Sequence, residues 1–165
     1  MTESKITARY LSPIGAITLV SDGESLTGLQ FTGGSEQGWN QPQGQPTGQN
    51  LPIFIETCRW LDLYFGGIKP DFTPLIKPRG TLFQQKVWQE LLAIPYGQTT
   101  TYGAIAKRLN CRSAQAVGQA IHRNPIAIII PCHRVIGSNG TLTGYAAGLG
   151  IKQQLLQLES NFIPS

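Results

Sequence analysis

The sequence is poor in charged residues and in residues that commonly bind metals. Charged residues make up 13% of the 165-residue chain and hydrophobic residues 41%, which indicates a globular protein rather than a disordered one. The three cysteines and two histidines show no CxxC spacing, so neither a disulfide framework nor a structural zinc site is expected. GxGxxG and P-loop motifs are also missing, and we therefore expect no metal and no cofactor.

Long apolar segments are absent as well. The best apolar run, residues 126–130, is far shorter than the roughly 18 residues of a membrane span. The first residues lack the apolar core of a secretory signal. These absences predict a cytoplasmic protein with no membrane partner, in which the cysteines stay reduced.

The net charge of +4 is unevenly distributed. From residue 80 onward, seven basic residues stand against two acidic ones, whereas the preceding part carries a small negative excess. A basic half joined to a nearly neutral half indicates a polyanionic partner such as DNA. Scattered solvated lysines and arginines would give the same count, so charge alone leaves both interpretations open.

Residues 1–77 are predicted to form an N-terminal α/β domain with an antiparallel sheet. Three short β-prone runs are separated by turn sequences; they span residues 6–11, 16–21 and 25–31. The Gly/Gln-rich stretch at 33–50 has too little apolar surface to order itself and is expected to be a flexible loop. A helix is predicted over 51–65, capped by Asn50, with Ile55 and Cys58 on its apolar face.

Residues 78–165 are predicted to form a mainly helical domain. Thr81, Thr101 and Ser113 each precede a segment with helical spacing of apolar residues and can cap it. The expected helices span 82–94, 102–109, 114–122 and 149–159. The second and third are short and closely spaced, as in a helix-turn-helix. The apolar run 126–130 should be buried, and it leads directly into Pro131-Cys132-His133-Arg134.

Cys132 is the candidate nucleophile. The thiolate is the reactive form, and an ordinary cysteine is only a few per cent thiolate near neutral pH (from a pKa of about 8.5). His133 as a base and the charge of Arg134 would both raise that fraction. On these residues alone, an inert buried cysteine beside an unrelated histidine is the other interpretation.

The predicted third helix carries unusually small side chains over residues 113–121. Small side chains let a helix approach a nucleic-acid groove closely, but tight packing against another helix would use them equally well. Arg112 and Arg123, at its two ends, fit phosphate contacts or solvated charges.

Residues 131–137, Pro-Cys-His-Arg-Val-Ile-Gly, resemble the active-site signature of the O6-alkylguanine-DNA alkyltransferases. The resemblance is strong from about residue 80 to 160, and weaker, mainly in architecture, before that. The further matching segments follow the family order: Phe83…Val87-Trp88, Pro95-Tyr96-Gly97, Thr101-Tyr102, Ala116-Val117-Gly118, Arg123-Asn124-Pro125, Leu142-Thr143-Gly144-Tyr145, Lys152, Leu155-Leu156 and Glu159.

The resemblance implies an α+β fold, with a ribonuclease H-like N-terminal domain and a C-terminal domain like a winged helix-turn-helix. The implied activity is DNA repair, in which a methyl or other alkyl group moves from O6-alkylguanine in duplex DNA to Cys132. O4-alkylthymine is a further candidate substrate. The reaction would occur once per molecule, because a thioether is a poor leaving group, and a monomer suits such a protein.

The resemblance also assigns roles within the site. His133 would act through a water as the base for Cys132, and Glu159 would orient His133. Asn124 would tie the helical segments together, and Tyr102 would donate a proton or hydrogen bond to the leaving guanine. The residues expected around the base are Val135, Tyr145, Ala146 and Ala147.

DNA contacts are expected mainly from the helix-turn-helix. They are assigned to Arg112, Ser113, Ala114, Gln115, Ala116, Gly118, Arg123 and Arg134. Gln115 departs from the family pattern, because an arginine there fills the gap left by the rotated base. Glutamine lacks the charge and reach of arginine, so weaker DNA affinity or slower base flipping is expected.

Two other interpretations compete with a transferase. A lesion-binding module would grip alkylguanine with an unreactive Cys132, and incorporation of label from alkylated DNA separates the two. A thiol hydrolase using Cys132 and His133 would turn over repeatedly and would not need the basic helix-turn-helix.

Overall fold

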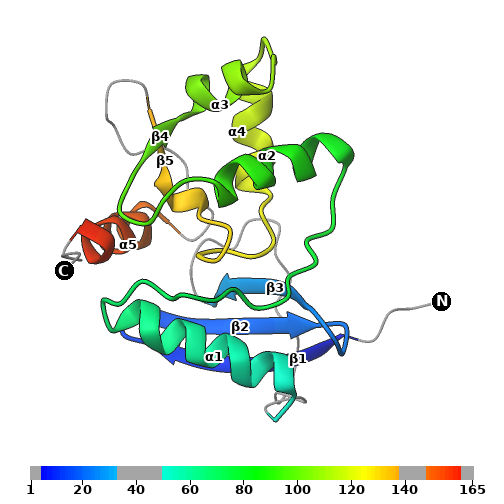
Figure 1. Ribbon diagram of the computed structural model, residues 1–165, viewed down its shortest axis with the longest axis vertical. Coiled ribbons are helices and arrows are strands. Elements are labelled where there is room, and N and C mark those ends of the chain that lie inside the picture. The colour runs from blue at the N-terminus through cyan, green and yellow to red at the C-terminus, as the bar shows by residue number, and fades with distance from the viewer. Residues whose placement is uncertain (1–4, 33–49, 138–147, 161–165) are drawn as a thin grey trace.

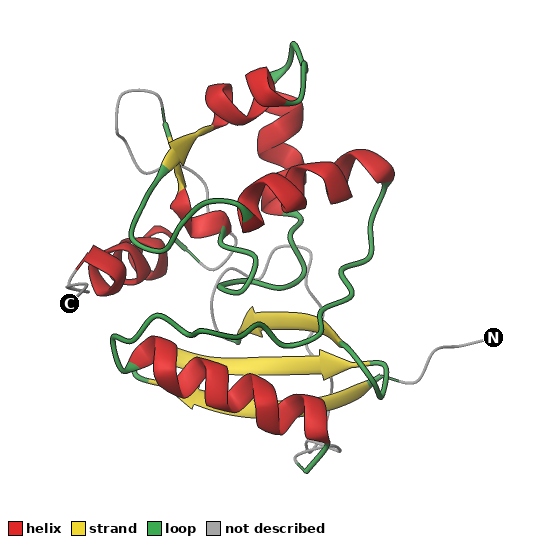
Figure 2. Cartoon of the chain, viewed as in Figure 1, coloured by secondary structure: helices red, strands yellow, loops and turns green. Residues whose placement is uncertain are grey.

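The computed structural model describes residues 5–32, 50–137 and 148–160. Figure 1 shows an antiparallel sheet with helix α1 against one face, and the other helices beyond the β3 edge of the sheet. Figure 2 shows the same division, with all long strands in one half and most helices in the other. The expected mixed α+β class is confirmed.

The sheet contains three strands in the order β1-β2-β3. They are β1 (Ile6–Ser12), β2 (Gly15–Ser21) and β3 (Leu26–Phe31). The β1–β2 register runs from Ile6 opposite Ser21 to Ser12 opposite Gly15, so Pro13 and Ile14 form a tight turn between these two strands. Burial of Ile17 and Leu19 on β2 and of Leu29 on β3 holds the sheet in the core.

Helix α1 (Pro52–Phe65) packs against one face of the sheet. Its N-cap is Leu51 and no side chain caps it, so the predicted cap by Asn50 is wrong. Pro52 fits the first turn because its missing N–H has no helical partner there. Ile55 is 51% exposed, and its place on the apolar face is therefore also wrong. The buried positions are Ile53, Phe54, Thr57, Trp60, Leu61 and Tyr64.

The C-terminal half contains the other helices and two short strands. They are α2 (Leu82–Leu92), β4 (Thr100–Thr101), α3 (Tyr102–Arg108), α4 (Ala114–His122), the 3-10 turn η1 (Cys132–Arg134), β5 (Val135–Ile136) and α5 (Leu149–Ser160). Thr81, Thr101 and Ser113 each accept a hydrogen bond from a first-turn N–H, which confirms the three predicted caps. Buried Trp88 on α2 donates its indole N–H to the carbonyl of Ala120 at 2.9 Å and so fixes α4 against α2.

Two segments from later in the chain pair with β3. The Leu26 N–H donates to the Leu75 carbonyl at 2.8 Å, and the Leu29 N–H donates to the Pro125 carbonyl at 2.9 Å. The Ala127 N–H returns a bond to the Leu29 carbonyl at 2.9 Å. The stretch 126–130 is buried as predicted, and its contact with β3 brings the chain before Cys132 onto the three-stranded sheet.

No helix in the described ranges is long and apolar enough to cross a bilayer.

Candidate active site

Two consecutive tight turns place Cys132. Ile128 has φ +72°, which is uncommon for a β-branched residue, and the Ile129 N–H donates to the Ala127 carbonyl across it. Pro131, at φ −80° and ψ 66°, forms an inverse γ-turn in which the Cys132 N–H donates to the Ile130 carbonyl at 2.8 Å. The proline ring holds φ near this value. Cys132 is 7% exposed and forms no disulfide.

Asn124 braces these turns from inside the protein. Its Nδ2 donates to the Ile130 carbonyl at 2.8 Å, and its Oδ1 accepts from the Ile126 N–H at 3.0 Å. Asn124 is 6% exposed, so both bonds are protected from water. The side chain thus links the end of α4 to the chain that enters η1.

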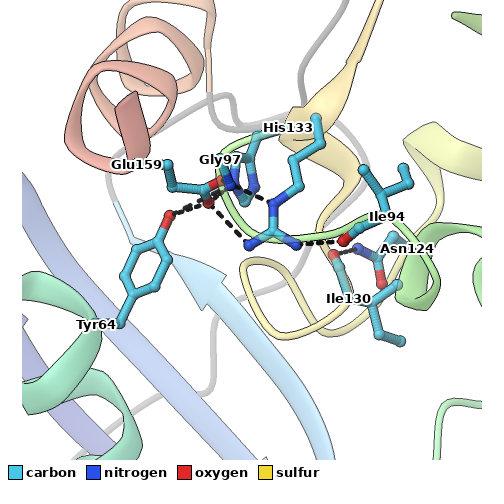
Figure 3. Close-up of polar contacts among 8 residues, drawn as sticks. Tyr64, Ile94, Gly97, Asn124, Ile130, His133 and Glu159 are labelled. Carbon is cyan, nitrogen blue, oxygen red and sulfur yellow. Dashed lines mark hydrogen bonds and ion pairs between the residues drawn. The ribbon is translucent and has the colours of Figure 1, made fainter. Parts of the chain in front are cut away.

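The Glu159 carboxylate, on α5, lies at the centre of a buried polar network (Figure 3). Its contacts come from four residues that are distant in sequence. Its Oε1 accepts from Arg134 Nε at 2.8 Å and from the Gly97 N–H at 3.1 Å; its Oε2 accepts from Tyr64 at 2.6 Å and Arg134 Nη2 at 3.1 Å, and lies 2.5 Å from His133 Nε2. These donors fill the acceptor sites of an ionised carboxylate.

Hydrogen bonding and charge from His133 and Arg134 overcome the effect of burial and lower the pKa of Glu159 to about 2. The carboxylate is therefore ionised at neutral pH and can only accept hydrogen bonds. Nε2 of His133 must then carry the proton in the 2.5 Å contact. This tautomer leaves Nδ1 with a lone pair, and Nδ1 has no hydrogen-bond partner among the described residues.

Burial lowers the pKa of His133 below its usual value, although Glu159 acts in the opposite direction. The imidazole is accordingly neutral at pH 7. A neutral imidazole with a basic Nδ1 and a carboxylate on Nε2 has the chemistry of a general base. It lies directly after the Cys132 thiol in η1.

Lys152 on α5 is also fully buried. Burial lowers the pKa of its ammonium, while the charge of the Cys132 thiolate raises it. By reciprocity, an ammonium at this position favours ionisation of the Cys132 thiol.

Two of the residues expected near the guanine lie at the short strands: Tyr102 directly follows β4, and Val135 begins β5. Tyr102 follows the cap residue Thr101, is half-buried, and its ring lies 3.7 Å from the position of a Cβ at Gly118. Val135 is buried and pairs with Thr100 in the parallel β4–β5 ladder. The remaining candidates, Tyr145, Ala146 and Ala147, lie outside the described residues.

Most residues expected to contact DNA are exposed or half-buried around α4, whereas Arg134 is buried. Side chains exposed to solvent around α4 are Arg112, Ser113, Ala114, Gln115 and Arg123, with Ala116 and Gly118 half-buried on the same helix. Arg134 is instead 8% exposed, and besides Glu159 its Nη1 donates to the Ile94 carbonyl at 2.7 Å. The guanidinium of Arg134 is thus committed to groups inside the protein, and the DNA contact expected of Arg134 stays a prediction.

Three features of this site were not assigned from the sequence. Arg134 holds Glu159, Tyr64 reaches Glu159 from α1, and Gly97 supplies a backbone N–H with φ +81°. The Pro95-Tyr96-Gly97 motif was a usable signal for the last, since glycine tolerates positive φ. Across residues 5–32, 50–137 and 148–160, no three His, Cys, Asp or Glu side chains form a cluster that could hold a metal.

Two family models together match most of the chain. The model described as the 6-O-methylguanine DNA methyltransferase ribonuclease-like domain matches residues 6–76, and that described as the DNA binding domain matches residues 82–161. A methylated-DNA–protein-cysteine methyltransferase of Methanosarcina acetivorans is 48% identical over 155 residues, which cover 93% of this chain and 97% of the relative.

Solved structures give the same result. The O6-methylguanine methyltransferase of Mycobacterium tuberculosis matches with a TM-score of 0.86 at 41% identity, over 98% of this chain and 96% of that one. The OGT of the same organism in complex with DNA matches with a TM-score of 0.79 at 43% identity, over 95% and 94% of the two chains. On its sequence, its fold and the arrangement around Cys132, the chain belongs to the 6-O-methylguanine DNA methyltransferase family.

Proposed function

We propose that this chain repairs O6-alkylguanine in duplex DNA by transferring the alkyl group to Sγ of its own Cys132. The observation that carries the proposal is the buried His133–Glu159 pair, whose histidine directly follows Cys132 in η1 and whose carboxylate comes from α5. Relatives named as methylated-DNA–protein-cysteine methyltransferases support the reaction, and the complex of a neighbour with DNA supports the partner.

The transfer begins with the thiol proton. Nδ1 of His133 takes this proton through a water, and Glu159 stabilises the imidazolium that forms through its bond to Nε2. Lys152 adds positive charge near the sulfur. The thiolate attacks the alkyl carbon, so an S–C bond forms as the C–O6 bond breaks and its electron pair goes to the guanine. The guanine is protonated and leaves as the ordinary base.

The damaged base must leave the stack to reach Cys132, at a cost of a few kcal/mol. We assign Tyr102 as the donor to the leaving guanine and the backbone at Cys132 and Val135 to recognition of its exocyclic amine. The loop holding Tyr145, Ala146 and Ala147 would wall the pocket.

The exposed residues around α4 form the proposed DNA surface. Arg112 and Arg123 would contact phosphates, and the small side chains between them would permit close approach to the groove. Gln115 would occupy the position of the rotated base. The proposal also includes two domains, residues 1–77 and 78–165. The protein would be a cytoplasmic monomer that needs no metal and no cofactor.

The test is an intact-mass measurement after incubation with a duplex carrying one O6-methylguanine. One added methylene on the peptide containing Cys132, absent with unmodified DNA and limited to one per protein, is the expected result. Lesion binding without a mass gain would place the chain among lesion-recognition proteins. Repeated turnover of a fluorogenic ester or peptide substrate would instead indicate a thiol hydrolase.

A further inference from the structure

Tyr64 connects the N-terminal domain to the proposed catalytic pair. It lies on α1, 95 residues before Glu159 in sequence, and its hydroxyl donates to Glu159 Oε2 at 2.6 Å. The same oxygen accepts a hydrogen bond from Nε2 of His133. The Tyr64 oxygen is only 3.4 Å from that nitrogen. Figure 3 shows Tyr64 reaching the carboxylate from the side of α1.

The Tyr64 ring is held in place on several sides. It stacks on Trp60 with ring centres 5.3 Å apart and meets Tyr96 edge-on at 6.0 Å. It also meets the His133 ring edge-on at 6.5 Å. The side chain is completely buried, so its hydroxyl is fixed on Oε2 with little further loss of conformational freedom.

The direction of each hydrogen bond follows from the charge of Glu159. Because the carboxylate only accepts, Tyr64 and His133 both donate to Oε2 and share its negative charge. A strong O–H donor on this oxygen weakens the pull of Glu159 on the imidazole proton. The Tyr64 hydroxyl also holds Glu159 Oε2 in the position in which it accepts the hydrogen bond from His133 Nε2.

We propose that Tyr64 is a positioning residue for the transfer to Cys132, setting through Glu159 Oε2 both the orientation and the basicity of His133. This inference rests on the proposed function. It makes the N-terminal domain part of the reaction through a single hydroxyl.

Other ionisable groups also face His133 and influence its pKa, so the test must leave them unchanged. They come from three elements and one loop: Glu159 and Lys152 on α5, Cys132 and Arg134 on η1, Tyr64 on α1, and Tyr96 in the loop before β4. Tyr64→Phe removes only the Tyr64 hydroxyl and keeps its ring and all the other groups.

The experiment is the pH dependence of the single-turnover transfer rate in the full chain. The rate of a reaction that needs neutral His133 rises with pH through the pKa of that group. In Tyr64→Phe, Glu159 holds the imidazole proton more tightly. The rising limb of the plot of transfer rate against pH therefore moves to higher pH by about 0.5 to 1 pH unit. The rate at low pH falls correspondingly, while DNA affinity is unchanged.

A matched control is a tyrosine on β1 whose hydroxyl also bonds to a carboxylate, in this case one on α1. The Tyr10 hydroxyl donates to Asp62 of α1 at 2.6 Å, away from the site, so Tyr10→Phe removes a similar bond without touching Glu159. We expect its pH limb to coincide with that of the native chain. Coincident limbs for Tyr64→Phe and the native chain, or equal shifts in both variants, would overturn the proposal.

A second substitution tests the proposal if Tyr64→Phe folds poorly. 3-Fluorotyrosine at position 64 is a more acidic and stronger donor, so its limb should move to lower pH, and movement upward or not at all contradicts the proposal. The same profiles can be measured without DNA by using iodoacetamide, which alkylates a thiolate and releases iodide. Because Cys58 and Cys111 are also free thiols, peptide mapping follows the alkylation of Cys132 alone. A native chain that reacts with iodoacetamide but not with O6-methylguanine would contradict the proposed function while still testing Tyr64.

Discussion

Arg134 and Glu159 form a bidentate ion pair inside the protein, with Nε donating to Oε1 at 2.8 Å and Nη2 to Oε2 at 3.1 Å. Their charges compensate each other, so the adjacent His133 can stay neutral in the same buried space. Without the guanidinium, the ionised carboxylate would lack its permanent counter-charge and would draw a proton onto the imidazole. The pair therefore keeps the base ready to accept a proton.

The stability of the chain should depend on the charge of Glu159. Its pKa is about 2 in the folded state against an ordinary value of 4.5, so the contribution is fully present above about pH 5 and is lost as pH falls toward 2. The lowered pKa corresponds to on the order of 3 kcal/mol. Urea unfolding of the native chain and Glu159→Gln at pH 7 and pH 3.5 measures it.

Glu159→Gln should be less stable at pH 7 by about 3–5 kcal/mol, because Arg134 keeps an uncompensated buried charge. The difference between the two proteins should shrink by about 1 kcal/mol at pH 3.5. A difference that stays constant with pH would show that the carboxylate is not ionised in the way described.

Cys132→Ser should lose transfer and keep lesion binding. The serine hydroxyl is a much weaker acid and nucleophile than a thiol, so the transfer rate should fall by at least roughly a thousandfold. Single-turnover kinetics and a gel-shift titration with the same O6-methylguanine duplex measure the two properties. Retained methyl transfer in this variant would identify another acceptor.

Gly97→Ala should disturb Glu159 through the backbone. Gly97 has φ +81° and its N–H donates to Glu159 Oε1 at 3.1 Å, so alanine should destabilise by about 1–2 kcal/mol and slow the transfer. Gly103→Ala is the control, since a Cβ there meets nothing within 4 Å in α3. It should stabilise by about 0.5–1 kcal/mol. Thermal melting and transfer rates compare them.

Gln115→Arg should bind DNA more tightly than the native chain. A new phosphate or base contact from α4 should steepen the slope of log affinity against log salt by about 0.9. Leu11→Arg adds the same charge at a site on β1 that is 78% exposed, and should leave the slope unchanged. Equal affinities for Gln115→Arg and the native chain would mean that glutamine already serves at this position.

Features set by neighbouring residues were predictable from the sequence. The caps Thr81, Thr101 and Ser113 bond to N–H groups three residues further on, so each is decided within one turn of helix. The buried stretch 126–130 was equally clear, because a continuous apolar run has few stable places outside a core.

Features set by distant residues were not predictable in this way. The sequence placed Arg134 beside Cys132, but its partner Glu159 is 25 residues away, and nothing local separates an internal ion pair from a phosphate contact. Tyr64 was not singled out from the sequence, where it is one of several aromatic residues in the segment predicted as a helix over 51–65. Its second partner, His133, is 69 residues away, and only the packing of α1 beside η1 and α5 brings the two together.

The pairing along β3 also bears on how the chain avoids self-association. An open strand edge is a template for another copy, and on β3 the positions of Leu26 and Leu29 are paired by 75–77 and 125–127. A fragment ending at residue 77 would lose the second cover and leave apolar Leu29 beside unpaired backbone groups. The N-terminal half expressed alone should therefore aggregate. In the intact chain, residues 125–127, which lead to Cys132, occupy this edge of β3.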